Sequence, residues 1–365
     1  MLKCPASLQT VRRIALPPGI PARLVSAFPF PRFPTVPKLA NISAFQHACT
    51  PACNFRYTFD CRARTPNLAK LRISIVQYLN TAPLVRSFTH GPLRGKYDLS
   101  FTVPSLCAEA LRSGAADIAI IPAIEYQRIG DLVVLPNLAI ASKNRVRSLL
   151  IISKGPIENV RNIALDSGSR STQALTRILC DRRWQIAPDF FEMPPNTSTM
   201  LQKADAALLI GDPALRLSIE IEGGAERGPS GEQVCTASLA GIPDAGSLHV
   251  YDVVEEWRRM TDLPAVLAVW AARPEVVTPE VVADFTASRD LGLARIKEIS
   301  LDAARELQLP GQALESYLRH NIDFSLGAEN RQGLDLYYRY AANLGLIPQA
   351  RPIEWAPAKA KAVKL

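Results

Sequence analysis

The stretch LRISIVQYLNTAPL, residues 71–84, decides the fold of this chain. It begins with an apolar run typical of a buried strand and ends in a segment with helical spacing. Asn80 and Thr81 stand between the two, and Pro83 suits the first turn of a helix. We therefore expect a strand followed by a helix that Asn80 and Thr81 cap.

This junction also predicts where a ligand binds. The first N–H groups of a helix have no partner within the helix and favour an anion. In an open α/β sheet, ligands bind beyond the carboxyl ends of the strands. The stretch therefore predicts a site for a small anionic ligand.

The positive charge of the chain is concentrated at its beginning. The net charge is +8, but the first 70 residues hold ten Lys or Arg against one acid, so the remaining 295 sum to −1. No apolar run reaches the roughly 18–20 residues that a membrane span needs. We expect a folded body that binds neither nucleic acid nor a membrane.

The first 68 residues have the composition of an unstructured segment. The first 70 residues carry ten of the 29 prolines, and such spacing breaks helix and sheet alike. The apolar run Ile14–Leu16 is followed at once by two prolines, which is too short for a secretory signal. We expect residues 1–68 to be a disordered, basic extension or translated sequence upstream of the real start, and a functional basic arm is the alternative. Residues 351–365 are expected to be a flexible tail.

The cysteines favour a reducing compartment. Four of the seven lie in the extension, where Cys49, Cys53, Cys61 and His47 lack the paired short loops of a zinc site. The other three are far apart in the sequence, which suits the cytoplasm. We expect isolated thiols, no metal and no cofactor.

Strand and helix signals alternate along the body of the chain. Strands are expected at 71–76, 98–103, 117–122, 132–135, 148–153, 162–166, 206–212 and 265–271. Helices are expected at 105–113, 171–180, 281–285, 291–299 and 334–344. The alternation predicts an α/β fold with two lobes around a cleft. We expect 69–155 and 266–350 in lobe 1 and 156–265 in lobe 2, with crossings near Ser153 and Ala265.

Four polar clusters follow predicted strands. They are Asn80 with Thr81, Ser105 after Pro104, Ser169–Thr172 after Asp166, and Gly211 with Asp212. Each by itself is explained by helix capping, and Ser105 is placed to cap the helix after it. Together they predict a ligand site, in which Arg170 and the hydroxyls of Ser169, Ser171 and Thr172 bind a carboxylate.

The clusters lack the residues of most catalytic sites. They contain no histidine, no phosphate-binding glycine loop and no nucleophile elbow. Glu125 could act as a base, but a cap or an ion pair between the lobes is the favoured interpretation. An enzyme with this site would work with hydroxyls, an amide and the geometry of its bound substrate.

The body, residues 71–345, resembles the chorismate dehydratases of the futalosine route to menaquinone. Six stretches carry the resemblance, in this order: Gln77–Leu84, Gly114–Tyr126, Val146–Ser148, Ala164–Thr172, Asp205–Ala214 and Asp252–Arg273. The resemblance implies a two-lobed fold of the type II periplasmic-binding-protein kind, with mixed sheets flanked by helices. A sister family that forms 1,4-dihydroxy-6-naphthoate ends its first strand in a Cys-Pro-Asn type motif, whereas this strand ends in Tyr78-Leu79-Asn80-Thr81.

The resemblance also implies a reaction and its residues. Chorismate would lose its ring hydroxyl and the proton at its ether-bearing carbon, giving 3-[(1-carboxyvinyl)oxy]benzoate and water. The enolpyruvyl carboxylate of the substrate would take the proton, with Asn80 and Ser148 as the catalytic residues. Thr81, Ser105, Gly211 and Asp212 would join the hydroxyl cluster in binding chorismate. The protein would be a monomer or a homodimer, and the alternatives are the sister enzyme and a solute-binding protein for a small carboxylate.

Overall fold

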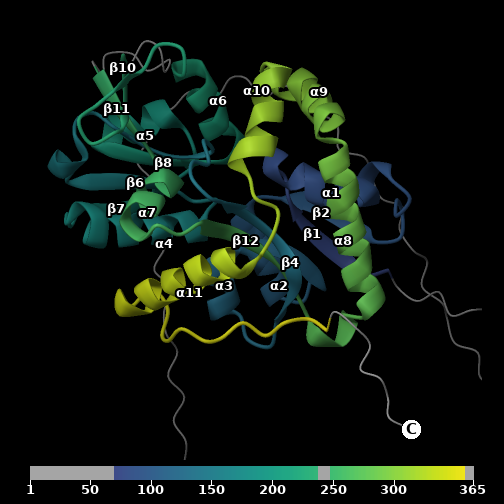
Figure 1. Cartoon of the computed structure of the whole chain (residues 1–365). Helices are drawn as coiled ribbons and strands as arrows, with labels where there is room; N and C mark the ends of the chain where they lie inside the picture. Colours follow the sequence, from purple (N-terminus) through teal and green to yellow (C-terminus); the bar gives the residue numbers. More distant parts are fainter. Residues whose placement is uncertain (1–69, 237–246, 358–365) are drawn as a thin grey trace, which may run out of the picture. The chain divides into compact units, whose positions relative to one another are not determined.

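The apolar runs of the sequence form two β-sheets in the computed structural model, which describes residues 70–236 and 247–357 (Figure 1). These residues lie in one unit, Pro66–Leu365. All eight predicted strands are present. The extension with its cysteine cluster, residues 237–246 and residues 358–365 are outside the described part.

Lobe 1 is built on a five-stranded sheet. Its order is β2 (Asp98–Thr102), β1 (Arg72–Val76), β3 (Ile118–Pro122), β12 (Ala265–Ala272) and β4 (Val133–Ser142). The first three strands run parallel, while β12 is antiparallel to both of its neighbours. Every residue of β3 is buried because helices cover both of its faces.

Lobe 2 is built on a seven-stranded sheet. Its order is β7 (Asp189–Met193), β6 (Asn162–Asp166), β8 (Ala206–Ile210), β5 (Leu149–Ser153), β11 (Ser247–Asp252), β10 (Gln233–Thr236) and β9 (Glu226–Arg227). Only β7, β6 and β8 are parallel, so both sheets are mixed. The sequence did not predict β7, β9, β10 or β11, in which charged or polar residues interrupt or replace the apolar run.

Helices cover the sheets. The set comprises α1 (Ala82–His90), α2 (Pro104–Arg112), α3 (Ala123–Arg128), α4 (Arg170–Leu179), α5 (Thr197–Lys203), α6 (Gly211–Ile221), α7 (Val253–Thr261), α8 (Pro279–Ala294), α9 (Ile296–Leu307), α10 (Gly311–Ser316) and α11 (Ala328–Asn343). The predicted helix 291–299 spans the break between α8 and α9. Helix α8 packs closely along α1 (Figure 1). Glycine at position 292 permits this approach, because a Cβ there would overlap the Pro83 carbonyl. None of the helices in the described ranges has the length and apolar character to cross a membrane.

The first crossing between the lobes lies earlier than expected. Strand β5 pairs with β8 and β11 in the sheet of lobe 2, so the chain leaves lobe 1 after Ser142, not near Ser153. The apolar run of β5 did not distinguish the two sheets, since all of its residues are buried in either case. The second crossing lies between α7 and β12, at residues 262–264.

The beginning of the expected flexible tail is ordered against lobe 1. Strand β4 is at the edge of its sheet, and Val134 N donates to Glu354 O while Ala356 N donates to Val134 O. The Trp355 ring lies under the Arg331 guanidinium, and Ala356 is buried. Residues 351–357 therefore cover an edge that would otherwise expose unpaired backbone groups.

Candidate functional site

A small cavity lies at the carboxyl ends of the central strands, between the two lobes. Its volume is about 50 Å³. It is lined by Val76, Tyr78, Asn80, Pro104, Pro122, Ile140, Leu149, Ser169, Thr172, Ile210, Gly211, Leu267 and Ala268. Asn80, Ser169, Thr172 and Gly211 are residues that the sequence assigned to substrate or catalysis. Small-molecule pockets are typically about 300–1,000 Å³, so the lobes enclose this cavity too tightly for a ligand.

The Tyr78 ring lies against the turn at Gly211 and lines the cavity. A Cβ on Gly211 would lie 2.6 Å from Tyr78 Cζ, so only glycine lets the ring approach this turn. Gly211 also has φ +69°, a conformation that other residues rarely adopt. Burial, together with the nearby carboxylates of Asp166 and Asp212, raises the pKa of Tyr78. The ring is therefore a neutral, uncharged wall of the cavity.

Tyr78 also lines a second and larger cavity. This cavity, of about 790 Å³, is bounded by η1 (Leu79–Thr81), α1, α9 and Asp212. Thr81 and Asp212 line it, although the sequence placed both with the substrate. Asp212 accepts hydrogen bonds from Leu79 N at 3.1 and 3.3 Å, and so joins lobe 2 to lobe 1. Burial raises the pKa of Asp212 to about 6.

The start of α4 forms the polar side of the small cavity. Ser169 caps this helix: its Oγ accepts from Thr172 N at 3.3 Å and donates to Thr172 Oγ1 at 2.8 Å. Ser171 lies elsewhere, because its Oγ accepts from Ile124 N at 3.1 Å in lobe 1. Ser169 and Thr172 are thus the hydroxyls of this cluster that face the cavity.

Arg170 contacts a protein carboxylate. Its Nη1 lies 3.1 Å from Glu125 Oε2, and Arg112 and Arg128 contact the same fully buried side chain. Burial opposes ionisation of Glu125, but the three guanidinium groups outweigh it and hold its pKa below the usual value. The expected ion pair between the lobes is confirmed, since Arg170 begins α4 and Glu125 lies in α3.

Three expected caps are absent. Residues 79–81 form a 3₁₀ turn that leads directly into α1, so neither Asn80 nor Thr81 accepts a bond from the helix start. The Thr81 hydroxyl instead donates to Asn80 Oδ1 at 3.4 Å. Helix α2 begins at Pro104, one residue before Ser105, and Ser105 N donates to Gly168 O at 3.1 Å. Ser105 therefore joins the lobes through its backbone.

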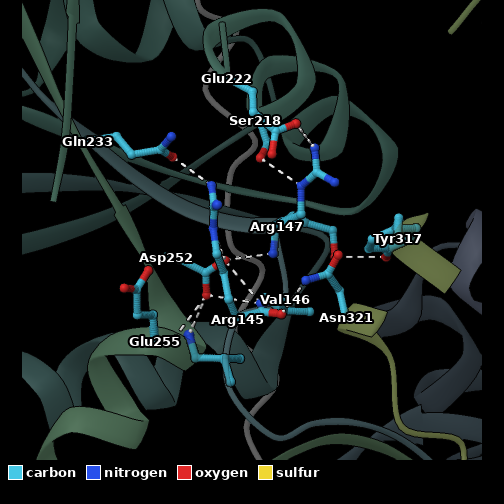
Figure 2. A network of polar contacts seen from close by, with 12 residues as sticks. Arg145, Val146, Arg147, Ser218, Glu222, Gln233, Asp252, Glu255, Tyr317 and Asn321 are labelled. Carbon is cyan, nitrogen blue, oxygen red and sulfur yellow. Dashed lines mark hydrogen bonds and ion pairs between the residues drawn. The ribbon is translucent and has the colours of Figure 1, made fainter. Parts of the chain in front are cut away.

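Ser148 ends the first crossing and is buried. A network of polar contacts holds the residues just before it, Arg145–Arg147 (Figure 2). The Asp252 carboxylate accepts bonds from Val146 N at 3.1 Å and Arg147 N at 2.6 Å, and it also caps α7. The guanidinium of Arg147 contacts Glu222. Ser148 O accepts from Gly211 N at 2.8 Å, which ties the crossing to the start of α6. The backbone on both sides of Ser148 is therefore fixed.

Sequence reasoning missed Tyr317, a buried residue at this site. Its hydroxyl donates to Ser148 Oγ at 2.9 Å. It belongs to a π-helical turn, η5 (Tyr317–Asn321), that continues α10. The apolar spacing around 311–321 gave no signal for such a turn.

Sequence comparisons relate this chain to known proteins. A family model described as menaquinone biosynthesis matches residues 71–343. A curated chorismate dehydratase of Thermus thermophilus is 28% identical over 285 residues, which cover 75% of this chain and 95% of the relative.

Solved structures show the same fold. A protein of Archaeoglobus fulgidus has a TM-score of 0.57 and 16% identity, covering 76% of this chain and 98% of its own. The periplasmic aliphatic sulphonate binding protein SsuA of Escherichia coli has a TM-score of 0.51 and 17% identity. The match covers 81% of this chain and 94% of SsuA. The expected two-lobed, periplasmic-binding-protein-like fold is confirmed.

Proposed function

This chain belongs to the menaquinone biosynthesis family, and on that premise we propose that it is a chorismate dehydratase of the futalosine route. The observation that carries the proposal is the match to the curated dehydratase over 95% of that relative's length. The family model by itself fits either enzyme of the route, and the curated relative favours dehydration over naphthoate formation. The cavity between the lobes is the proposed site.

The lining of the cavity supports a reaction without a protein base. Tyr78 is the one ionisable side chain among the described residues that line it. Glu125 is buried against three arginines, and its lowered pKa makes it a poor base. The carboxylate of the enolpyruvyl group takes the proton from the ether-bearing carbon, and the C–O bond to the ring hydroxyl breaks as the ring becomes aromatic. The abstracted proton and the departing hydroxide together make the water. The protein's task is to orient the substrate and to stabilise charge.

Each polar group of the cavity then has a role. Ser169, Thr172 and the first N–H groups of α4 bind a substrate carboxylate, because a helix start attracts an anion. The Asn80 amide donates to the departing hydroxyl. Ser148 does not line the closed cavity, and we assign it the second carboxylate or the hydroxyl once the lobes have separated. Arg170 is held by Glu125 in this structure, so we assign the carboxylate contact first to the α4 start.

Entry of chorismate requires the lobes to separate. The cavity of about 50 Å³ is enclosed by contacts of Tyr78 with Gly211 and of Leu79 with Asp212. These contacts join lobe 1 to lobe 2, so opening breaks them together. The three described cysteines are buried and free, which fits the action of this enzyme in the reducing cytoplasm.

The test is to incubate the purified chain with chorismate and to identify the product by mass spectrometry and NMR. The proposal predicts 3-[(1-carboxyvinyl)oxy]benzoate, formed faster than in a sample without protein. A folded protein that leaves chorismate unchanged would contradict it. Conversion of a later intermediate of the route without any action on chorismate would favour the naphthoate-forming enzyme.

A further inference from the structure

The Tyr317 hydroxyl contacts the proposed catalytic serine directly. Tyr317 Oη donates to Ser148 Oγ at 2.9 Å, and both residues are only 1% exposed. A phenol has a single proton to donate. Since Tyr317 gives that proton to Ser148, Ser148 must direct its own proton elsewhere. Within residues 70–236 and 247–357, the Ser148 hydroxyl has no acceptor for it.

The fold holds Tyr317 in place for this contact. After α10 the chain widens into the π turn Tyr317–Asn321, a rare conformation that is frequent at functional sites. At the end of this turn, Asn321 Nδ2 donates to Arg145 O at 2.9 Å (Figure 2). The turn therefore contacts the first crossing at two points, one on each side of Val146 and Arg147.

The residue before Ser148 in the first crossing has a strained backbone. Arg147 has φ +65°, which is uncommon for a residue with a side chain. Two interactions stabilise this conformation: Arg147 N donates to Asp252, and the guanidinium contacts Glu222 (Figure 2). Strain of this kind persists where the surrounding structure holds it, and it is concentrated at functional sites.

Asn80 completes the arrangement from lobe 1. Burial raises the pKa of Tyr317. The phenol stays protonated at neutral pH and remains a donor. Asn80 in turn lines the cavity. Asn80, Tyr317 and Ser148 thus lie in one group, of which Asn80 lines the closed cavity.

We propose that Tyr317 is a positioning residue for the dehydration, which holds the Ser148 hydroxyl so that it donates a hydrogen bond to the substrate. This inference rests on the proposed function. Neither Tyr317 nor Ser148 lines the closed cavity. Tyr317 contacts Ser148 directly, so it acts through the serine. Without the phenol, the serine hydroxyl rotates and can present a lone pair in place of its proton.

The test is a double-mutant cycle measured as turnover of chorismate. Tyr317→Phe removes one oxygen and keeps the ring, and we expect kcat to fall about ten- to a hundredfold with a smaller change in KM. Tyr338→Phe is the matched control. Its buried hydroxyl donates to Ala123 O at 2.8 Å, away from Ser148. The control should keep near wild-type turnover.

The cycle separates positioning from a general effect on structure. In a Ser148→Ala background, Tyr317→Phe should change kcat by less than about threefold, because residues that act as a unit are not additive. Thermal unfolding of both Tyr→Phe variants shows whether Tyr317→Phe loses more stability than its control. Similar stability with a loss of turnover confined to Tyr317→Phe supports the proposal.

Three results would overturn it. Turnover by Tyr317→Phe equal to that of Tyr338→Phe would show that the phenol positions nothing. An equal fall caused by Tyr317→Phe with and without Ser148 would show that Tyr317 acts independently of the serine. Folded wild-type protein without activity on chorismate would instead contradict the proposed function, and the inference about Tyr317 would then fail with it.

Discussion

Replacement of Asp252 by alanine should destabilise the protein far more than the loss of an ordinary helix cap. Asp252 caps α7 by accepting from Val254 N and Glu255 N at 3.0 and 3.1 Å. The same carboxylate accepts from Val146 N and Arg147 N, the backbone donors of the first crossing. One buried side chain therefore satisfies donors on two separate segments.

The size of the effect follows from these contacts. Loss of a helix cap typically costs about 1 kcal/mol. Two buried N–H groups at the crossing would also lose their acceptor, and each unsatisfied group costs about 1–3 kcal/mol. We expect Asp252→Ala to lower the free energy of unfolding by about 3–7 kcal/mol, a large share of the roughly 5–15 kcal/mol of a typical domain.

Urea unfolding followed by circular dichroism measures this difference. Thr278→Ala is the control, because Thr278 Oγ1 caps α8 by accepting from Val281 N and has no part in the crossing. The control should lose about 1 kcal/mol. A loss for Asp252→Ala no larger than for Thr278→Ala would refute the reasoning. The crossing would then satisfy its donors without Asp252.

Four further predictions follow from the site and the ends of the chain. Asn80→Ala and Ser148→Ala should each lower kcat on chorismate about 10²–10³-fold in a folded protein, since each removes a contact that strengthens as charge develops; retention of full kcat by either variant would remove that residue from the mechanism. Glu125→Gln should lower the free energy of unfolding, measured in urea, by up to about 3 kcal/mol, because partly exposed guanidinium groups lose a buried partner. Its folded fraction should keep most of its turnover, and inactivity would make Glu125 the base. The pKa of Asp212 is raised from 3.8 to about 6, so folding favours its protonated form. The stability gained from protonated Asp212 is fully present below pH 3.8 and is lost as the pH rises through about 6. Between these pH values, the free energy of unfolding of wild type, measured in urea, should therefore fall by roughly 3 kcal/mol relative to that of Asp212→Asn. A stability difference between the two proteins that does not vary with pH would contradict the raised pKa. Deletion of residues 1–68 should leave folding and turnover nearly unchanged, since the family match begins at residue 71, and loss of soluble expression would count against this.

The sequence predicted those features that depend on local pattern. The apolar runs of β3, β5 and β8 are buried along their whole length, and such runs are visible in any sequence. The helix start at Ser169 was also predictable, because a hydroxyl before a helical segment is a cap. Asn80 and Gly211 lie at strand ends, where ligands of such sheets bind.

Features that depend on contacts between distant segments were not predictable. Nothing in the sequence around Arg170 indicates that three arginines share Glu125, since these residues come from α2, α3 and α4. The crossing was placed after β5 because a buried strand looks the same in either sheet. The contact of Tyr317 with Ser148 joins residues 169 positions apart through a π turn that leaves no periodic signal.

The structure of the Asn80→Ala variant with chorismate would test the central claim most directly. Slow turnover should preserve the substrate long enough to observe it. We predict that chorismate lies between the lobes, with one carboxylate at the start of α4 within hydrogen-bonding distance of Ser169 or Thr172. The Tyr78 ring should then have moved away from Gly211 to make room. Chorismate bound outside this cleft, with wild-type protein active on it, would contradict the account.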